Sequence, residues 1–520
     1  MTTLNRRAFL KAMGISGVAV TQATALQEVL AHAVSQGGFV PTSATERDPI
    51  THVINRLTFG PTDHLIRNVQ EIGVSAFIEA QLNPENIDDS EFDATYGEVF
   101  PLLNEPSSEL MITEFEMRQQ ENNRNGVAQN LMRQLIGNWI YRSLASERQL
   151  HEIMAQFWAN HFSIHTDSIP DIFLRLDDER NVTRANPFGK FRDILYASAK
   201  SPAMLTYLDN ATSRKEAPNE NYARELMELH TLGVNGGYTE DDVKAVARAF
   251  TGWSVTRLRF GANRANENTE EPGQFYFNPE MHDTEEKVVL GHVIPAGGGI
   301  KDGEMVLDIL ASHPSTAQFI STKLVRRFVS DDPPATLVER TAQTYLATDG
   351  DIRSMLWTIF TSDEFWNATP KFKQPFEFII SSLRAMNYAP SRFESFARWL
   401  QPILINMGHI PFGRPSPDGY PDVGAYWMSN LLTRWNVAID IAHGMVNGAQ
   451  SSFRTLLEAN NVGSDAPSIL NFVGQLLYGR PLNTIEMDTI NAYLSAEGTT
   501  TETLQDMIAL MLAAPAFQYR

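Results

Sequence analysis

The chain has 520 residues, of which 43% are hydrophobic and 20% charged, the composition of a globular protein with a large core. It contains no cysteine, which excludes disulfides, thiolate metal sites and cysteine nucleophiles. A formal net charge of −20 repels nucleic acid and anionic lipid, so the composition argues against a general role on DNA or RNA.

The N-terminal segment predicts export. Arg6 and Arg7 precede a weakly apolar stretch with two glycines, and the residues Ala-His-Ala at 31–33 offer small side chains for cleavage. This order is typical of an export signal of the twin-arginine type, although Asn5 stands where such signals usually have Ser or Thr. The alternative is an amphipathic N-terminal helix. The stretch is too short and too interrupted by glycine to be a membrane span.

We therefore expect a signal peptide over 1–33, a linker over 34–50, and one large domain over 51–520. A break near 256–300 could divide that domain into two lobes. The expected location is the periplasm or the medium. The twin-arginine route carries folded proteins, often with their cofactor bound, so a divalent metal is a possible cofactor.

Most of the chain after residue 50 has apolar residues at helical spacing. No βαβ alternation or glycine-rich phosphate loop occurs, which argues against a nucleotide-binding α/β fold. The fold class we predict is mainly α: a multi-helical globular protein with a small β-hairpin insertion near 275–295, where short apolar stretches flank Gly291. The clearest helical segments are 63–82, 126–146, 147–162, 191–208, 219–233, 239–253, 315–329, 466–479 and 501–518.

Several segments in order give the sequence a family resemblance. It resembles the bacterial family catalogued as domain of unknown function 1800, over nearly all of the chain after the signal. The resemblance implies an exported protein, often encoded beside a protein with a sulfatase-like fold, and it implies no reaction. The segments that carry it are 53–62, 157–165, 202–234, 238–255, 277–291 and 419–427.

A first candidate site lies on the predicted helix of 219–233. Asn221, Glu225 and Glu228 share one stripe, and Arg224 can pair with Glu228 one turn on. One interpretation is a solvated polar face with a single ion pair. The other is a carboxylate pair in a cleft, with one glutamate as acid and the other as base and with Arg224 binding an anionic group.

A second candidate is a metal or acid–base site around His161. His161 and His165 could bind one metal if a single helix carries both, with His230 or His282 as a third ligand, or Glu225 or Glu228. The alternative is that these histidines merely end a helix. The H-E-x-x-H spacing and the paired E-x-x-H units of di-iron bundles are absent.

Candidate substrate-binding residues are Asp209 and Asn210, Asn221, and Trp253 as a sugar-stacking platform; turn formation and core packing are the alternatives. The loop 419–427 offers three further aromatic side chains, which could line a carbohydrate groove or simply pack.

Two functions compete, and a third, a metal- or cofactor-dependent redox protein, fits the twin-arginine signal but finds no haem, flavin or iron–sulfur motif in the sequence. The first is an exported hydrolase or lyase that acts on an extracytoplasmic polymer such as a polysaccharide, through a Glu/His acid–base or metal centre. The second is a non-catalytic export or assembly partner of the sulfatase-like neighbour. The enzyme predicts Glu225 and Glu228 in a concave pocket with a raised pKa. The partner predicts an exposed apolar patch.

Overall fold

A computed structural model describes residues 18–119, 126–166, 169–256 and 271–520. The fold is mainly α, as the sequence predicted, with three small two-stranded sheets. One continuous hydrophobic core runs through it from Leu26 to Phe517. Within the described part of the chain, no helix is long and apolar enough to cross a membrane.

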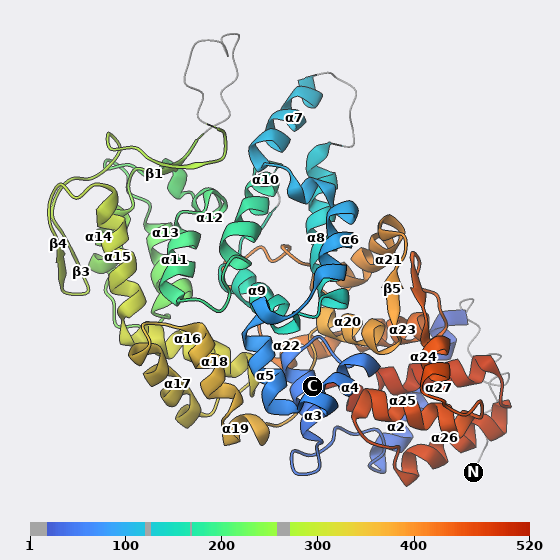
Figure 1. Cartoon of the computed structure of the whole chain (residues 1–520). Helices are drawn as coiled ribbons and strands as arrows, with labels where there is room; N and C mark the ends of the chain where they lie inside the picture. Colours follow the sequence, from blue (N-terminus) through green and yellow to red (C-terminus); the bar gives the residue numbers. More distant parts are fainter. Residues whose placement is uncertain (1–17, 120–125, 167–168, 257–270) are drawn as a thin grey trace.

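The centre of the molecule is built from helices that approach from distant parts of the sequence (Figure 1). Each buries an apolar stripe against its neighbours because apolar residues recur at helical spacing along it. These central helices are α8 (Val127–Ala145), α9 (Gln149–His161), α20 (Pro375–Ala385) and the short α22 (Gly424–Trp427); α16 (Pro314–Phe328) reaches them from the side that holds the middle of the chain.

On one side of this centre in Figure 1 lie the helices and hairpins of the middle of the chain. They are α10 (Ile169–Asp178), α11 (Phe191–Ala199), α12 (Pro202–Tyr207), α13 (Glu220–Glu225), α14 (Glu240–Ala249), α15 (Ile300–Ser312), α17 (Ala335–Ala347), α18 (Ile352–Phe360) and α19 (Asp363–Trp366).

The other side holds the first and last parts of the described chain, which therefore lie close together. These elements are α2 (Val18–Ser35), α3 (Pro49–Leu57), α4 (Asp63–Ile72), α21 (Phe393–Asn406), α23 (Leu431–Ala442), α24 (Phe453–Ala459), α25 (Ala466–Tyr478), α26 (Thr484–Glu497), α27 (Thr501–Ala513) and α28 (Pro515–Gln518). Helix α5 (Val74–Leu82) lies below α9 near the centre of the view and contacts both α9 and α18. The remaining helices, α6 (Ser90–Val99) and α7 (Ser107–Gln119), precede α8.

The predicted hairpin near 275–295 is confirmed. β3 (Lys287–Val289) and β4 (His292–Ile294) pair antiparallel across Gly291, whose φ of +81° suits a glycine at this turn. β2 (Phe275–Phe277) pairs instead with β1 (Trp253–Val255), and β5 (Tyr388–Pro390) pairs with β6 (Ala449–Ser451).

The predicted helix of 219–233 also forms, with a change of pitch. The Asn219 side chain caps its start by accepting from the Tyr222 amide at 3.0 Å. After Glu225 the helix widens into a π-helical turn, Leu226–Thr231, and Gly233 follows with a φ of +78°. Such π turns occur often at functional sites.

Candidate functional site

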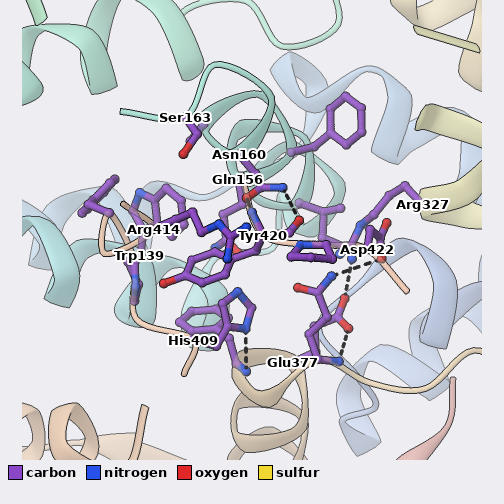
Figure 2. Close-up of a pocket in the computed structure, with 18 of the residues that line it drawn as sticks. Trp139, Gln156, Asn160, Ser163, Arg327, Glu377, His409, Arg414, Tyr420 and Asp422 are labelled. Carbon is purple, nitrogen blue, oxygen red and sulfur yellow. Dashed lines mark hydrogen bonds and ion pairs between the residues drawn. The ribbon is translucent and has the colours of Figure 1, made fainter. Parts of the chain in front are cut away.

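A pocket of about 240 Å³ opens where α9, α16 and α20 meet the segment 409–422. Figure 2 shows side chains from all four converging on it. Its wall is partly aromatic, so it can hold a ring or a chain against flat surfaces. Its lining includes the aromatic residues Trp139, Phe157, Phe376, Phe412 and Tyr420, the amides Gln156, Asn160 and Gln374, and the charged residues Lys323, Arg326, Arg327, Glu377, Arg414, Asp418 and Asp422.

Asn160, in the last turn of α9, holds the loop that forms one wall of the pocket. Its Nδ2 donates to the Tyr420 carbonyl at 3.0 Å, and its Oδ1 accepts from the Tyr420 amide at 2.7 Å. Gly419 makes this approach possible, because a Cβ there would lie 2.2 Å from the Asn160 carbonyl oxygen and its φ is +75°. The Trp427 indole donates to the Pro421 carbonyl at 2.9 Å and fixes the other side of the loop.

The three carboxylates that line the pocket are all ion-paired. Arg327 contacts Glu377 at 2.7 Å, Lys371 contacts Asp422 at 3.1 Å, and Arg414 contacts Asp418 at 3.1 Å. Burial alone would raise the pKa of Glu377, but Arg327 and Arg520 outweigh it and lower that pKa to about 2. Glu377 is therefore a carboxylate at neutral pH and cannot serve as a proton donor.

Two cations of the pocket have no carboxylate partner among the residues that the structure describes. Lys323 Nζ donates to His161 Nδ1 at 2.8 Å, and Arg326 Nε donates to the Asp331 backbone carbonyl at 3.3 Å. Burial, with a smaller effect of Arg326, lowers the pKa of Lys323 to about 8. The pocket thus presents a guanidinium and an amine that is partly neutral near pH 8.

His161 is buried at the end of α9, where it accepts a hydrogen bond from Lys323 and does not bind a metal. Because its Nδ1 accepts from Lys323, its Nε2 carries the proton and donates to the His230 carbonyl at 3.0 Å. Burial, together with Lys323, holds the pKa of His161 well below its usual value, so the ring is neutral. Both ring nitrogens are occupied, which leaves no lone pair for a metal.

The predicted metal set does not come together. His165 lies in the loop beyond the end of α9, so it is not one helical turn from His161 on a common face. The His230 ring is 6.1 Å from the His161 ring, between centroids, and burial lowers the pKa of His230 to about 3. Across the described ranges, no three His, Asp or Glu side chains gather closely enough to hold a metal ion. The donor set therefore does not fit the metal centre that we considered from the sequence.

His409 is a pocket residue with a defined tautomer. Its Nδ1 accepts from the Phe376 backbone amide at 3.4 Å, so the proton is on Nε2. The ring stacks on Trp427, with centroids 4.8 Å apart, and burial lowers its pKa to about 4. At neutral pH, His409 is thus a neutral hydrogen-bond donor through Nε2.

The glutamates of the 219–233 helix lie outside this pocket. Arg224 makes two hydrogen bonds to Glu240, at 2.9 and 2.8 Å, and is 3.8 Å from Glu228. Glu228 accepts from the Tyr238 hydroxyl at 2.6 Å. Burial, and then Glu228, raise the pKa of Glu225. The raised pKa of Glu225 is the property that we expect of an acid–base pair. However, neither Glu225 nor Glu228 lines the pocket.

Two of the predicted substrate-binding residues are structural. The Trp253 side chain is fully buried against Phe250 and Phe275, so it offers no surface for sugar stacking. Asn210 is also fully buried, and its Nδ2 donates to the Phe250 and Trp253 carbonyls at 3.2 and 3.3 Å. Tertiary packing involves both residues, as the core-packing alternative predicts for Trp253.

The other two predicted substrate-binding residues are exposed and lie outside the pocket. Asp209 adopts a φ of +60° at the turn after α12, and Asn221 lies on the surface of α13.

Sequence reasoning missed Lys323, Arg326, Glu377 and His409. A signal was available, because "KLVRRF" places Lys323 and Arg326 one helical turn apart on the predicted helix of 315–329. Among the aromatic residues of the loop 419–427, Tyr420 lines the pocket, whereas Trp427 is buried and stacks on His409.

A family model described as "Protein of unknown function (DUF1800)" matches residues 52–519, nearly the whole chain. The chain belongs to this family. No curated protein and no solved structure matches it. Two of the segments that suggested the DUF1800 family from sequence, 157–165 and 419–427, meet in the pocket, where Asn160 and Tyr420 join them.

Proposed function

We propose that this DUF1800 chain is an exported enzyme, with lyase chemistry favoured over hydrolysis, that acts on an anionic extracytoplasmic polymer such as an acidic polysaccharide. The observation that carries the proposal is the pair of pocket cations, Lys323 and Arg326, neither of which forms an ion pair with a carboxylate of the described chain. A guanidinium and an amine side by side favour a carboxylate, sulfate or phosphate group.

The size and walls of the pocket support a single polymer unit as the group bound. Pockets that enclose small ligands usually measure about 300–1,000 Å³, and this one measures about 240 Å³. Tyr420 and Phe412 provide flat apolar surface beside the cations. The rest of a long chain would lie outside the pocket.

The carboxylates of the pocket argue against a two-carboxylate glycosidase. Such enzymes need one carboxyl group that is protonated at working pH. Glu377, Asp418 and Asp422 are each ion-paired, and the pKa of Glu377 is about 2. The groups suited to proton transfer are instead Lys323 and, as a hydrogen-bond donor, His409.

These residues suit a β-elimination next to a carboxylate. Arg326 would hold the carboxylate, and neutral Lys323 would take the proton from the adjacent carbon. The electron pair of that C–H bond forms a C=C bond, the C–O bond to the next unit breaks, and the departing oxygen takes a proton from water. His409 Nε2–H would hydrogen-bond to the departing oxygen. A pKa of about 8 places Lys323 close to working pH, where a general base is most effective.

The test is a screen of anionic and neutral polysaccharides, read by the ultraviolet absorbance of an unsaturated product. We expect product from an anionic polymer only.

Lys323→Met should lower kcat about 10²–10⁴-fold, the usual contribution of a general base. Arg326→Met should mainly raise KM. The matched control is Lys244→Met, which removes an exposed cation of α14 and should leave the rate unchanged. Turnover of neutral polymers, or full activity of Lys323→Met, would exclude this mechanism.

A second candidate is the non-catalytic partner, and one surface feature favours it. Ile405, Tyr426, Met428, Leu431 and Leu432 are each between 44% and 54% exposed. The Asn430 side chain donates to the Met407 carbonyl at 2.9 Å, so the 426–432 segment lies against the end of α21 that carries Ile405. Leu431→Glu with Leu432→Glu should abolish capture of the exported sulfatase-like neighbour if this function holds. It should leave polymer turnover intact if the enzyme function holds.

A further inference from the structure

Helix α2 is an integral part of the folded body, although most of it falls within the predicted signal peptide. Leu26, Leu30 and Ala33 are 1%, 6% and 1% exposed. Their spacing of four and three residues places them on one face of the helix. That face packs on α23, α26 and α27.

The packing continues beyond the helix into the segment that we expected to be a linker. Phe39 is fully buried, its amide donates to Glu486 Oε1 at 2.7 Å, and its carbonyl accepts from the Ala516 amide at 2.8 Å. Gly38 fits because a Cβ there would lie 2.9 Å from Ile485 Cγ2. The chain is therefore fixed to the C-terminal helices from Leu26 onward.

The small residues at 31–33 consequently lie inside a packed helix. Cleavage after Ala33 would remove Leu26 and Leu30 and would expose the apolar surfaces of α23, α26 and α27 that they cover. Removal of two buried leucines by a single cut would lower the stability of the fold substantially. The twin-arginine route carries folded proteins, so the peptidase would also meet Ala33 already buried.

The sequence holds a second small–x–small motif directly before the buried stripe, Ala23-Thr24-Ala25. We propose that the exported chain is cut after Ala25, and that residues 26–35 remain as a permanent helix of the C-terminal bundle. This inference rests on the export part of the proposed function and is independent of the reaction.

The test is the N-terminal sequence and intact mass of the protein, expressed with its own leader and purified after export. A mature chain that begins at Leu26 is the expected result. A chain that begins at Val34, or an exported chain that still begins at Met1, would overturn the proposal. A chain that is never exported would overturn the proposal together with the export part of the function, whatever its activity.

A matched pair of variants isolates the motif. Signal peptidases require a small residue three positions before the cut as well as one directly before it. Ala23→Leu should therefore abolish processing. Ala31→Leu, at an exposed position of α2, should not affect a cut after Ala25, and the mature protein would then retain the new leucine. We expect the Ala31→Leu protein to be processed and to carry the added mass of leucine. Loss of processing in Ala31→Leu alone would place the cut after Ala33.

Discussion

At the scale of single residues, the pocket is defined by which charges are neutralised and which are not. Glu377 is held as a carboxylate by Arg327 and Arg520, so it serves to fix those arginines. Lys323 is held by a neutral imidazole, which accepts a hydrogen bond without adding negative charge. The same pocket therefore contains the ion pairs of Glu377, which stay charged at neutral pH, and the Lys323 amine, which can lose its proton near pH 8.

The pKa of Lys323 predicts a pH profile. Burial lowers that pKa from its ordinary value to about 8, so the amine loses its proton as pH rises through about 8. If neutral Lys323 is the base, kcat/KM should rise with pH and level off above about 8. A bound anion favours the charged amine, so the midpoint in kcat should lie at higher pH. Steady-state kinetics across this range test the prediction, and an unchanged midpoint in Lys323→Met would contradict it.

At the scale of elements, the clamp between α9 and the 419–422 loop shapes one wall of the pocket. Asn160→Ala removes both hydrogen bonds to Tyr420 and should cost about 1–3 kcal/mol of stability. Hydrogen exchange of the Tyr420 amide should become faster. Asn160→Asp is the control, because its carboxylate still accepts from that amide and exchange should stay slow. If the Tyr420 amide exchanged as slowly in Asn160→Ala as in the unmodified protein, the clamp would not be what holds the loop.

Helix α2 offers a second prediction for an element. Leu30→Ala in the exported protein should lower the free energy of unfolding by about 2–5 kcal/mol, because Leu30 is 6% exposed in a packed interface. His32→Ala, at an exposed position of the same helix, should change it by less than about 0.5 kcal/mol. Denaturant unfolding measures both. No effect of Leu30→Ala would show that the mature protein lacks this helix.

At the scale of the whole molecule, buried neutral histidines make the fold sensitive to acid. Burial lowers the pKa of His52 to about 2, of His230 to about 3 and of His409 to about 4. Between about pH 6.5 and these values the unfolded chain binds protons that the folded chain does not, so stability falls as pH falls. Glu377 acts in the same direction below about pH 4.5.

Each such histidine should contribute a slope of about 1.4 kcal/mol per pH unit within its window. Thermal or denaturant unfolding between pH 7 and pH 5 measures the slope. His409→Gln should make it shallower by removing one titrating group. A stability that is flat over this range would contradict the prediction.

The sequence predicted the helices and the small hairpin because both depend on local spacing, as in 147–162 and 275–295. It could not predict the pocket, because the pocket depends on contacts between residues far apart in the chain. Lys323 meets His161, and Asn160 meets Tyr420, through the packing of α9 on α16 and on a distant loop. The sequence favoured Glu225 and Glu228 as a site because their polar stripe lies within one helix, where spacing alone makes it visible.

The clamp of Asn160 also has an evolutionary consequence. It uses the side chain of Asn160 and the close approach of Gly419, but only the backbone of Tyr420. Selection for the shape of the loop acts on positions 160 and 419 through this clamp. It also acts on position 420, because the Tyr420 hydroxyl donates to the Ile410 carbonyl at 3.0 Å and its ring lies against His409. We expect relatives to keep the residues at 160, 419 and 420 together, because all three support one conformation of the loop.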